Sequence, residues 1–275
     1  MKGRPEHTAR KPANGDLYLD VGLIQPGDVL LELGPDKDSA WIARATGGPF
    51  SHVALVVHRT FLFESEDLGV GYTPLRADRV ERRATGTRTL SRLHDVKAAV
   101  VLRYPRLSTK KAEDLFEDFV EALGPLDGKE YPAWVALATA APGGWLGTQL
   151  GRVVLSIADR IQKTQVWVPG PFCSELVAGV LADVLPRRRL FDKPRDPTRV
   201  NPNSFLRSRL QPVAAAVCEA DPNAAIDVEQ AKHYNASLLY TSRKQATGTM
   251  VGFRVVAKKA DLSLGNVKKM LQSFR

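Results

Sequence analysis

Two apolar segments that are separated by only three residues constrain the fold of this chain most strongly. Residues 51–57 (SHVALVV) are rich in β-branched side chains, and residues 61–65 (FLFES) follow after a short link. Such runs are typical of strands, and their close spacing predicts a β-hairpin. Residues 28–33 (DVLLEL) and 97–103 (KAAVVLR) are predicted to form two further strands. The N-terminal part of the chain is therefore expected to be rich in β-sheet.

Helices are predicted after this sheet-rich part. Between residues 108 and 123, apolar side chains recur at the i, i+3, i+4 and i+7 spacing of a single helical stripe. Another helix is predicted to begin at Phe172 or Cys173 and to end before Pro186. Weaker patterns predict helices over 148–163 and 224–234, a strand over 252–256 and a last helix from Ser263, capped near Asp261. Strands followed by helices indicate an α+β fold.

Length and composition place the chain among ordinary globular proteins. Its 275 residues are 44% hydrophobic and 25% charged, and their net charge is +9. We predict a flexible arm at 1–25, a main domain at 26–213 and a small α/β extension of unknown role at 214–275. The N-terminal residues lack the apolar run of a signal peptide, and proline and glycine interrupt the uncharged stretch at 131–151. We therefore expect a cytoplasmic protein without a transmembrane segment.

Cys173 is the first candidate for a catalytic residue. Because a Pro-Gly-Pro sequence at 169–171 cannot continue a helix, the predicted helix starts at or next to this thiol. The partial positive charge at a helix N-terminus stabilises a thiolate. The competing interpretation is a small buried hydrophobic side chain, as most free cysteines are. The second cysteine, Cys218, lies in an alanine-rich segment and is predicted to be inert.

His52 and Glu64 lie on the two strands of the predicted hairpin. His52 begins its strand at the sheet edge, where a general base would be accessible. The Glu64 carboxylate, one strand away, could accept the second imidazole N–H and fix the tautomer. The structural alternatives are a hydrogen-bonded histidine and a surface carboxylate at a strand end. No two histidines have metal-ligand spacing and no glycine-rich phosphate loop is present, so no metal and no cofactor are predicted.

Seven short motifs occur in an order that resembles a known family. They are GDVLLEL (27–33), GGPFSHVALVV (47–57), FLFESEDLGVGYTPL (61–75), VVLRYP (100–105), LDGKEYP (126–132), FCSELV (172–177) and NPNSFL (201–206). The order resembles the circularly permuted papain-fold amidases of the YaeF/YiiX type, which are relatives of the NlpC cell-wall peptidases and of lecithin–retinol acyltransferase. The resemblance implies a permuted papain-like core at 26–213, in which an antiparallel sheet packs against helices and the histidine strand precedes the cysteine helix.

The resemblance also implies roles for individual residues. Cys173 would be the nucleophile, His52 the base and Glu64 the residue that orients the base. Tyr131, in the GKEY segment, would help to stabilise the oxyanion, and an aromatic residue that merely flanks a helix is the equal alternative. The implied activity is that of a cysteine peptidase or amidase that forms a thioester. Its substrate would be a peptide, a cell-wall-derived fragment or a lipidated small molecule.

Two other functions stay open at this point. An acyltransferase or phospholipase could use the same three side chains, although Phe172 stands where acyltransferase-like relatives carry asparagine. Eight Lys and Arg residues at 187–209 and six arginines at 76–92 could instead bind phosphates. The corresponding function is a catalytically inactive protein that binds nucleic acid or anionic lipid. Because neither stretch has a recognised DNA-binding spacing, a solvated surface is the preferred interpretation.

Overall fold

A computed structural model of the chain describes residues 6–13, 15–66, 69–105, 107–129, 173–185, 190–193, 195–218 and 223–235. Over these residues the helices are α1 (Lys37–Ala45), α2 (Thr109–Asp114), α3 (Phe116–Leu123), α6 (Cys173–Val184), the 3-10 helices η1 (Gly124–Leu126), η2 (Pro197–Arg199) and η3 (Pro202–Arg207), and a helical segment at 228–235. The strands are β1 (Ala9–Arg10), β2 (Leu17–Asp20), β3 (Val29–Leu33), β4 (His52–His58), β5 (Phe61–Glu66), β6 (Gly69–Pro74), β7 (Arg79–Arg83), β8 (Gly86–Leu93), β9 (Ala98–Arg103), β10 (Gln211–Val213), β11 (Ala216–Cys218) and β12 (Ala225–Ile226).

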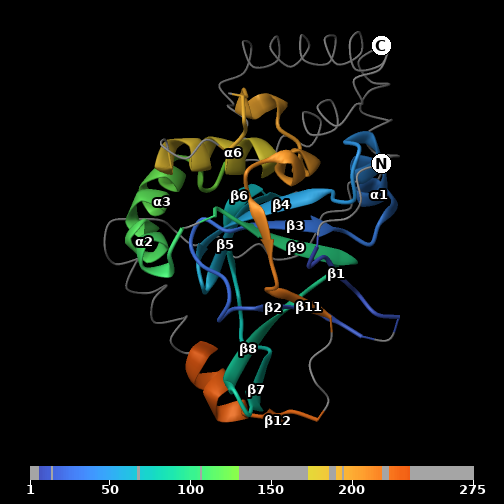
Figure 1. Cartoon of the computed structure of the whole chain (residues 1–275), viewed down its shortest axis with the longest axis vertical. Coiled ribbons are helices and arrows are strands. Elements are labelled where there is room, and N and C mark those ends of the chain that lie inside the picture. Colours follow the sequence, from blue (N-terminus) through green and yellow to red (C-terminus); the bar gives the residue numbers. More distant parts are fainter. Residues whose placement is uncertain are drawn as a thin grey trace.

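Two antiparallel sheets form the centre of the described structure (Figure 1). The first sheet has the strand order β1-β9-β3-β4-β5-β6, and β10 also pairs with β9. The second sheet has the order β11-β2-β8-β7-β12. The four strands that the sequence predicts at 28–33, 51–57, 61–65 and 97–103 are confirmed as β3, β4, β5 and β9. The predicted hairpin is also confirmed, because β4 pairs antiparallel with β5.

The first sheet is buried on both faces, which explains its continuous apolar strands. Along β4, Val53, Leu55 and Val57 belong to a core that also contains side chains of α3 and α6. Ala54 and Val56 point the other way, into a core shared with the second sheet. Figure 1 shows α2, α3 and α6 on one side of the first sheet and β2, β8 and β11 on the other. The α+β class and the packing of helices on an antiparallel sheet are therefore confirmed.

The second sheet corrects the predicted regions at both ends of the chain. Residues 17–20, placed by the sequence in a flexible arm, form β2, whose Leu17 and Leu19 side chains are buried. Residues 216–218 and 225–226, placed in a separate extension, form β11 and β12 and pair with β2 and β7. These strands are short and pair with partners distant in sequence, so hydrophobic periodicity within each segment gives little indication of them.

The helices follow the sequence pattern with one interruption. The predicted helix at 108–123 is divided into α2 and α3, because the Leu115 N–H bonds to the Ala112 carbonyl three residues back and forms a tighter turn. Its apolar stripe still packs in the core. The predicted cysteine helix is confirmed as α6, and the pattern at 224–234 corresponds to the helical segment at 228–235. The other predicted elements, at 148–163, at 252–256 and from Ser263, lie outside the described residues.

Candidate active site

The turn before His52 is built by the end of α1. Gly47 has a φ of 72°, and its N–H bonds to the Arg44 carbonyl at 3.1 Å. The Gly48 N–H bonds to the Ala43 carbonyl at 3.0 Å. These two bonds and the left-handed glycine form a Schellman motif, which ends the helix and turns the chain towards β4. The chain therefore turns directly before β4, and the sequence patterns did not predict α1.

His52 and Glu64 contact each other across neighbouring strands. The His52 Nε2 atom lies 3.0 Å from Glu64 Oε2, and the two side chains are 19% and 7% exposed. β4 pairs with β5 so that Leu55 lies opposite Phe63 and Val56 opposite Leu62. If the same register is continued along the strands, Glu64 lies diagonally across from His52. Long side chains reach each other across such diagonals. The carboxylate is therefore held against one nitrogen of the imidazole.

Thr73 is a member of this group that sequence reasoning missed. Its hydroxyl donates a hydrogen bond to Glu64 Oε1, the carboxylate oxygen that does not face His52. Thr73 pairs with Leu62 on β5, and Gly71, which lacks a side chain, pairs with Glu64. Because glycine has no side chain, Glu64 has no side chain directly opposite it on β6. The two-residue spacing of glycine and threonine in GYTP is the sequence feature that indicates this contact.

Cys173 approaches His52 from the helical layer that packs on the first sheet. It is the first residue of α6 and is 6% exposed, and the apolar side chains that follow it on α6 pack in the core with β4 and β5. The neighbouring Ser174 hydroxyl donates to the Val200 carbonyl at 2.6 Å. Across the layer boundary, the Cys173 side chain lies close enough to the His52 ring to raise its pKa. The imidazole thus lies between a thiol and a carboxylate.

The charge state of His52 follows from these contacts. Burial of the ring opposes its positive charge, but the hydrogen bonds to Cys173 and Glu64, together with the negative charge of both partners, act in the opposite direction. The balance holds the pKa of His52 well above its usual value of 6.5.

The structure brings Cys173, His52 and Glu64 together, and their catalytic roles stay predictions. Tyr131, the predicted oxyanion residue, lies outside the described residues. His58, at the opposite end of β4, has its Nδ1 atom 2.6 Å from the Thr60 hydroxyl. Cys218 is exposed on the second sheet. Within the described ranges, no group of three or more His, Cys, Asp or Glu side chains could hold a metal ion.

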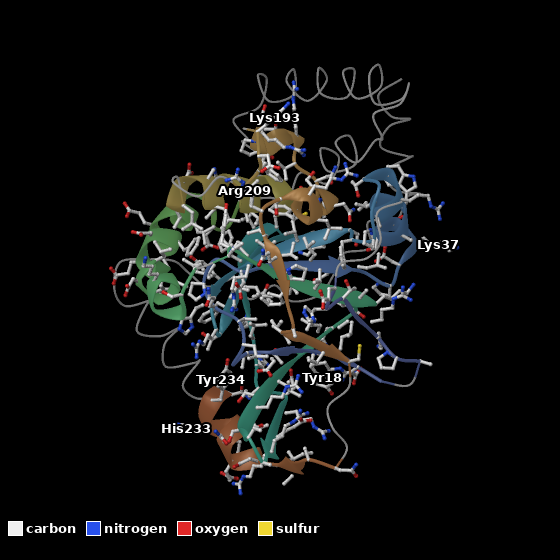
Figure 2. All side chains as sticks on the ribbon, viewed as in Figure 1. Tyr18, Lys37, Lys193, Arg209, His233 and Tyr234 are labelled. Atoms are coloured by element: carbon white, nitrogen blue, oxygen red, sulfur yellow. The ribbon has the colours of Figure 1, made fainter. Side chains whose placement is uncertain are left out.

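The arginine-rich stretch at 76–92 is largely paired with carboxylates. The pairs join Arg79 and Arg83 to Glu81, Arg82 to Asp227, Arg88 to Asp20, and Arg92 to Asp16. The Glu81 side chain is fully buried between its two arginines. In the second basic stretch, Lys193 and Arg209 lie on the helix side of the molecule, far from Tyr18 and Tyr234 on the second-sheet side (Figure 2). Across the part of the chain that is described, no helix has the length and apolar character needed to span a bilayer.

Comparison with solved structures gives weak similarity. No family model matches the sequence, and no curated protein matches it either. A solved structure, titled "Crystal structure of metalloprotein yiiX from Escherichia coli O157:H7, DUF1105", has a TM-score of 0.34 and 15% sequence identity. The match covers 70% of this chain and 97% of that chain. A similarity of this strength indicates no function for this chain.

Proposed function

We propose that this chain is a cysteine hydrolase that cleaves an amide bond through a thioester intermediate. The observation that carries the proposal is the His52 imidazole, held between the Glu64 carboxylate and the Cys173 thiol. A nucleophile in contact with a base, and a base oriented by a third group, form the constellation that activates cysteine and serine nucleophiles on unrelated folds. The raised pKa of His52 supports a resting thiolate–imidazolium pair.

The residues act in a defined order in this mechanism. The Cys173 thiolate attacks the amide carbonyl carbon, a C–S bond forms, and the carbonyl oxygen becomes an oxyanion. The backbone N–H groups at the start of α6 and, as predicted from the resemblance, the Tyr131 hydroxyl stabilise the oxyanion. His52 gives its proton to the leaving nitrogen as the C–N bond breaks. Neutral His52 then takes a proton from water, the resulting hydroxide attacks the thioester carbonyl, and breakage of the C–S bond restores the thiolate–imidazolium pair.

The chain order of the site supports a permuted papain-like core. His52 and Glu64 come from β4 and β5, and Cys173 follows on α6, more than a hundred residues later. In papain-like enzymes the cysteine helix precedes the histidine strand, so the order here corresponds to a circular permutation. The same resemblance suggests a peptide, a cell-wall-derived fragment or a lipidated small molecule as substrate. An acyltransferase or phospholipase would use the same three side chains and would differ in its product.

The paired arginines of the second sheet favour the hydrolase over an inactive nucleic-acid- or lipid-binding protein. An arginine that is already bonded to a carboxylate must break that ion pair before it can bind a phosphate. Nucleic-acid-binding proteins owe much of their affinity to Lys and Arg side chains that neutralise phosphates and so release the counterions bound to the nucleic acid. A salt titration of DNA or anionic-vesicle binding separates the two functions, because a binding protein would show a steep loss of affinity between low and moderate salt.

Two cysteine variants test the proposal. Cys173→Ala should abolish hydrolysis of amide and ester substrates, and Cys218→Ala should leave it unchanged. In mass-spectrometric mapping at about pH 6, iodoacetamide should modify Cys173 before Cys218. Because Cys173 is buried and Cys218 is exposed, accessibility alone predicts the opposite order. Equal activity of the two variants, or faster alkylation of Cys218, would contradict the proposed function.

A further inference from the structure

A buried segment after α6 contacts the neighbours of both proposed catalytic side chains. We propose that Asn203 is a positioning residue which, together with the Val200 carbonyl, fixes Cys173 and His52 relative to each other. We call residues 200–203 the clasp. This inference rests on the proposed function, because it concerns the geometry of the same Cys173–His52 pair. Three sets of contacts support it.

Asn203 holds the chain immediately before His52. Its Oδ1 atom accepts the Phe50 N–H at 3.0 Å, and its Nδ2 group donates to the Phe50 carbonyl at 2.7 Å. The same Nδ2 group donates to the Thr46 hydroxyl at 2.6 Å. Asn203 is only 3% exposed, so water competes little for these bonds. A side-chain amide that bonds both polar groups of one residue fixes that residue's backbone in the way that a paired strand does.

Gly48 provides the space that this contact requires. A Cβ atom at residue 48 would clash with the carboxamide of Asn203. The neighbouring Gly47 is different, because a Cβ atom there would meet nothing within 4 Å and its φ of 72° alone favours glycine. The two glycines of the Gly-Gly-Pro turn therefore have separate functions. Gly47 ends α1, and Gly48 leaves room for the Asn203 side chain.

The other end of the clasp holds the residue after the nucleophile. The Val200 carbonyl accepts the buried Ser174 hydroxyl at 2.6 Å, and Ser174 follows Cys173 in the first turn of α6. The clasp itself is well ordered, because Asn201 and Ser204 form a capping box around the start of η3. One short segment thus bonds to the residue after Cys173 and to the residue two positions before His52. A change in the clasp should therefore change the Cys173–His52 contact.

The reactivity of Cys173 tests this positioning without a known substrate. The full-length chain is treated with iodoacetamide over a range of pH, and the alkylation rate of Cys173 is measured by mass spectrometry. Asn203→Ala and the isosteric Asn203→Asp should raise the pH of half-maximal alkylation by about one unit, which is about a tenfold lower rate at pH values well below the wild-type midpoint. Gly48→Ala should raise the same pH, because its methyl group would displace the Asn203 side chain. The double variant Gly48→Ala/Asn203→Ala should shift this pH no further than Asn203→Ala does.

Asn235 supplies a matched control. Its side chain also bonds both backbone groups of one residue, accepting the Ala77 N–H at 2.9 Å and donating to the Ala77 carbonyl at 3.4 Å, but in the helical segment at 228–235. Asn235→Ala should lower stability and leave the alkylation profile of Cys173 unchanged. The positioning role of the clasp is refuted if Asn203→Asp and Gly48→Ala both keep the wild-type alkylation profile of Cys173. It is also refuted if Asn235→Ala shifts that profile as much as the Asn203 variants do. If wild-type Cys173 shows no enhanced reactivity at all, the proposed function fails first and the clasp fails with it.

Discussion

Replacing Glu64 by glutamine should lower the pKa of His52 by about 1–3 units. The facing atoms are 3.0 Å apart and the two side chains are mostly buried. At an effective dielectric constant of about 20, two unit charges at this distance attract by about 5 kcal/mol. One pKa unit corresponds to about 1.4 kcal/mol, and the glutamine amide oxygen can still accept a hydrogen bond from the imidazole, which retains part of the stabilisation. Glutamine keeps the size and removes the charge, so the equilibrium constant for forming the thiolate–imidazolium pair should fall about 10- to 1000-fold.

The assay is an NMR titration of the His52 imidazole in the wild type and in Glu64→Gln. Glu229→Gln is the control, since Glu229 is an exposed carboxylate that pairs with Lys232. Because the pKa of His52 is raised in the folded protein, its contribution to stability is fully present below about pH 6.5 and is lost as pH rises through the folded pKa. Glu64→Gln should therefore destabilise the protein more at about pH 6 than in alkaline solution. An unchanged His52 titration midpoint in Glu64→Gln would refute this reasoning.

Three further changes test the supporting structure by the free energy of unfolding. Thr73→Val removes the hydroxyl that donates to Glu64 Oε1 and should cost about 1–3 kcal/mol, while the pKa of His52 stays raised. Arg103→Ala leaves the buried Asp28 carboxylate without its guanidinium and should cost about 3–5 kcal/mol at neutral pH. Burial raises the pKa of Asp28, so this loss should shrink as acid protonates the carboxyl; a pH-independent loss would contradict it. Gly47→Ala should cost about 1–2 kcal/mol, and Gly47→Asn should cost less.

Local patterns predicted the elements that carry the three candidate site residues. The apolar runs around His52 and Glu64 indicated β4 and β5, because both segments are buried and bounded by turn residues. The Pro-Gly-Pro sequence before Cys173 indicated where α6 begins. Each of these features depends on residues that are close in the sequence. For that reason a sequence alone contains enough information to find them.

The second sheet shows where local patterns fail. β7 and β8 carry many arginines, and these charges predicted only a solvated basic surface. Buried Glu81 neutralises two of these arginines, and β2 and β12 supply pairing partners from the two ends of the chain. A strand of this kind is stable only after distant segments have met. Periodicity within the strand therefore does not reveal it.

The sequence by itself determined which short segments become strands and helices, and it placed a thiol, an imidazole and a carboxylate at the ends or edges of those elements. Only the tertiary structure decided that the three groups meet, that Thr73 supports Glu64, and that Asn203 bonds the backbone 153 positions earlier in the chain. The physical reason is the distance along the chain over which each kind of interaction acts. Backbone conformation and hydrophobic alternation are set by near neighbours, whereas hydrogen bonds between side chains of different layers exist only when the whole core has packed.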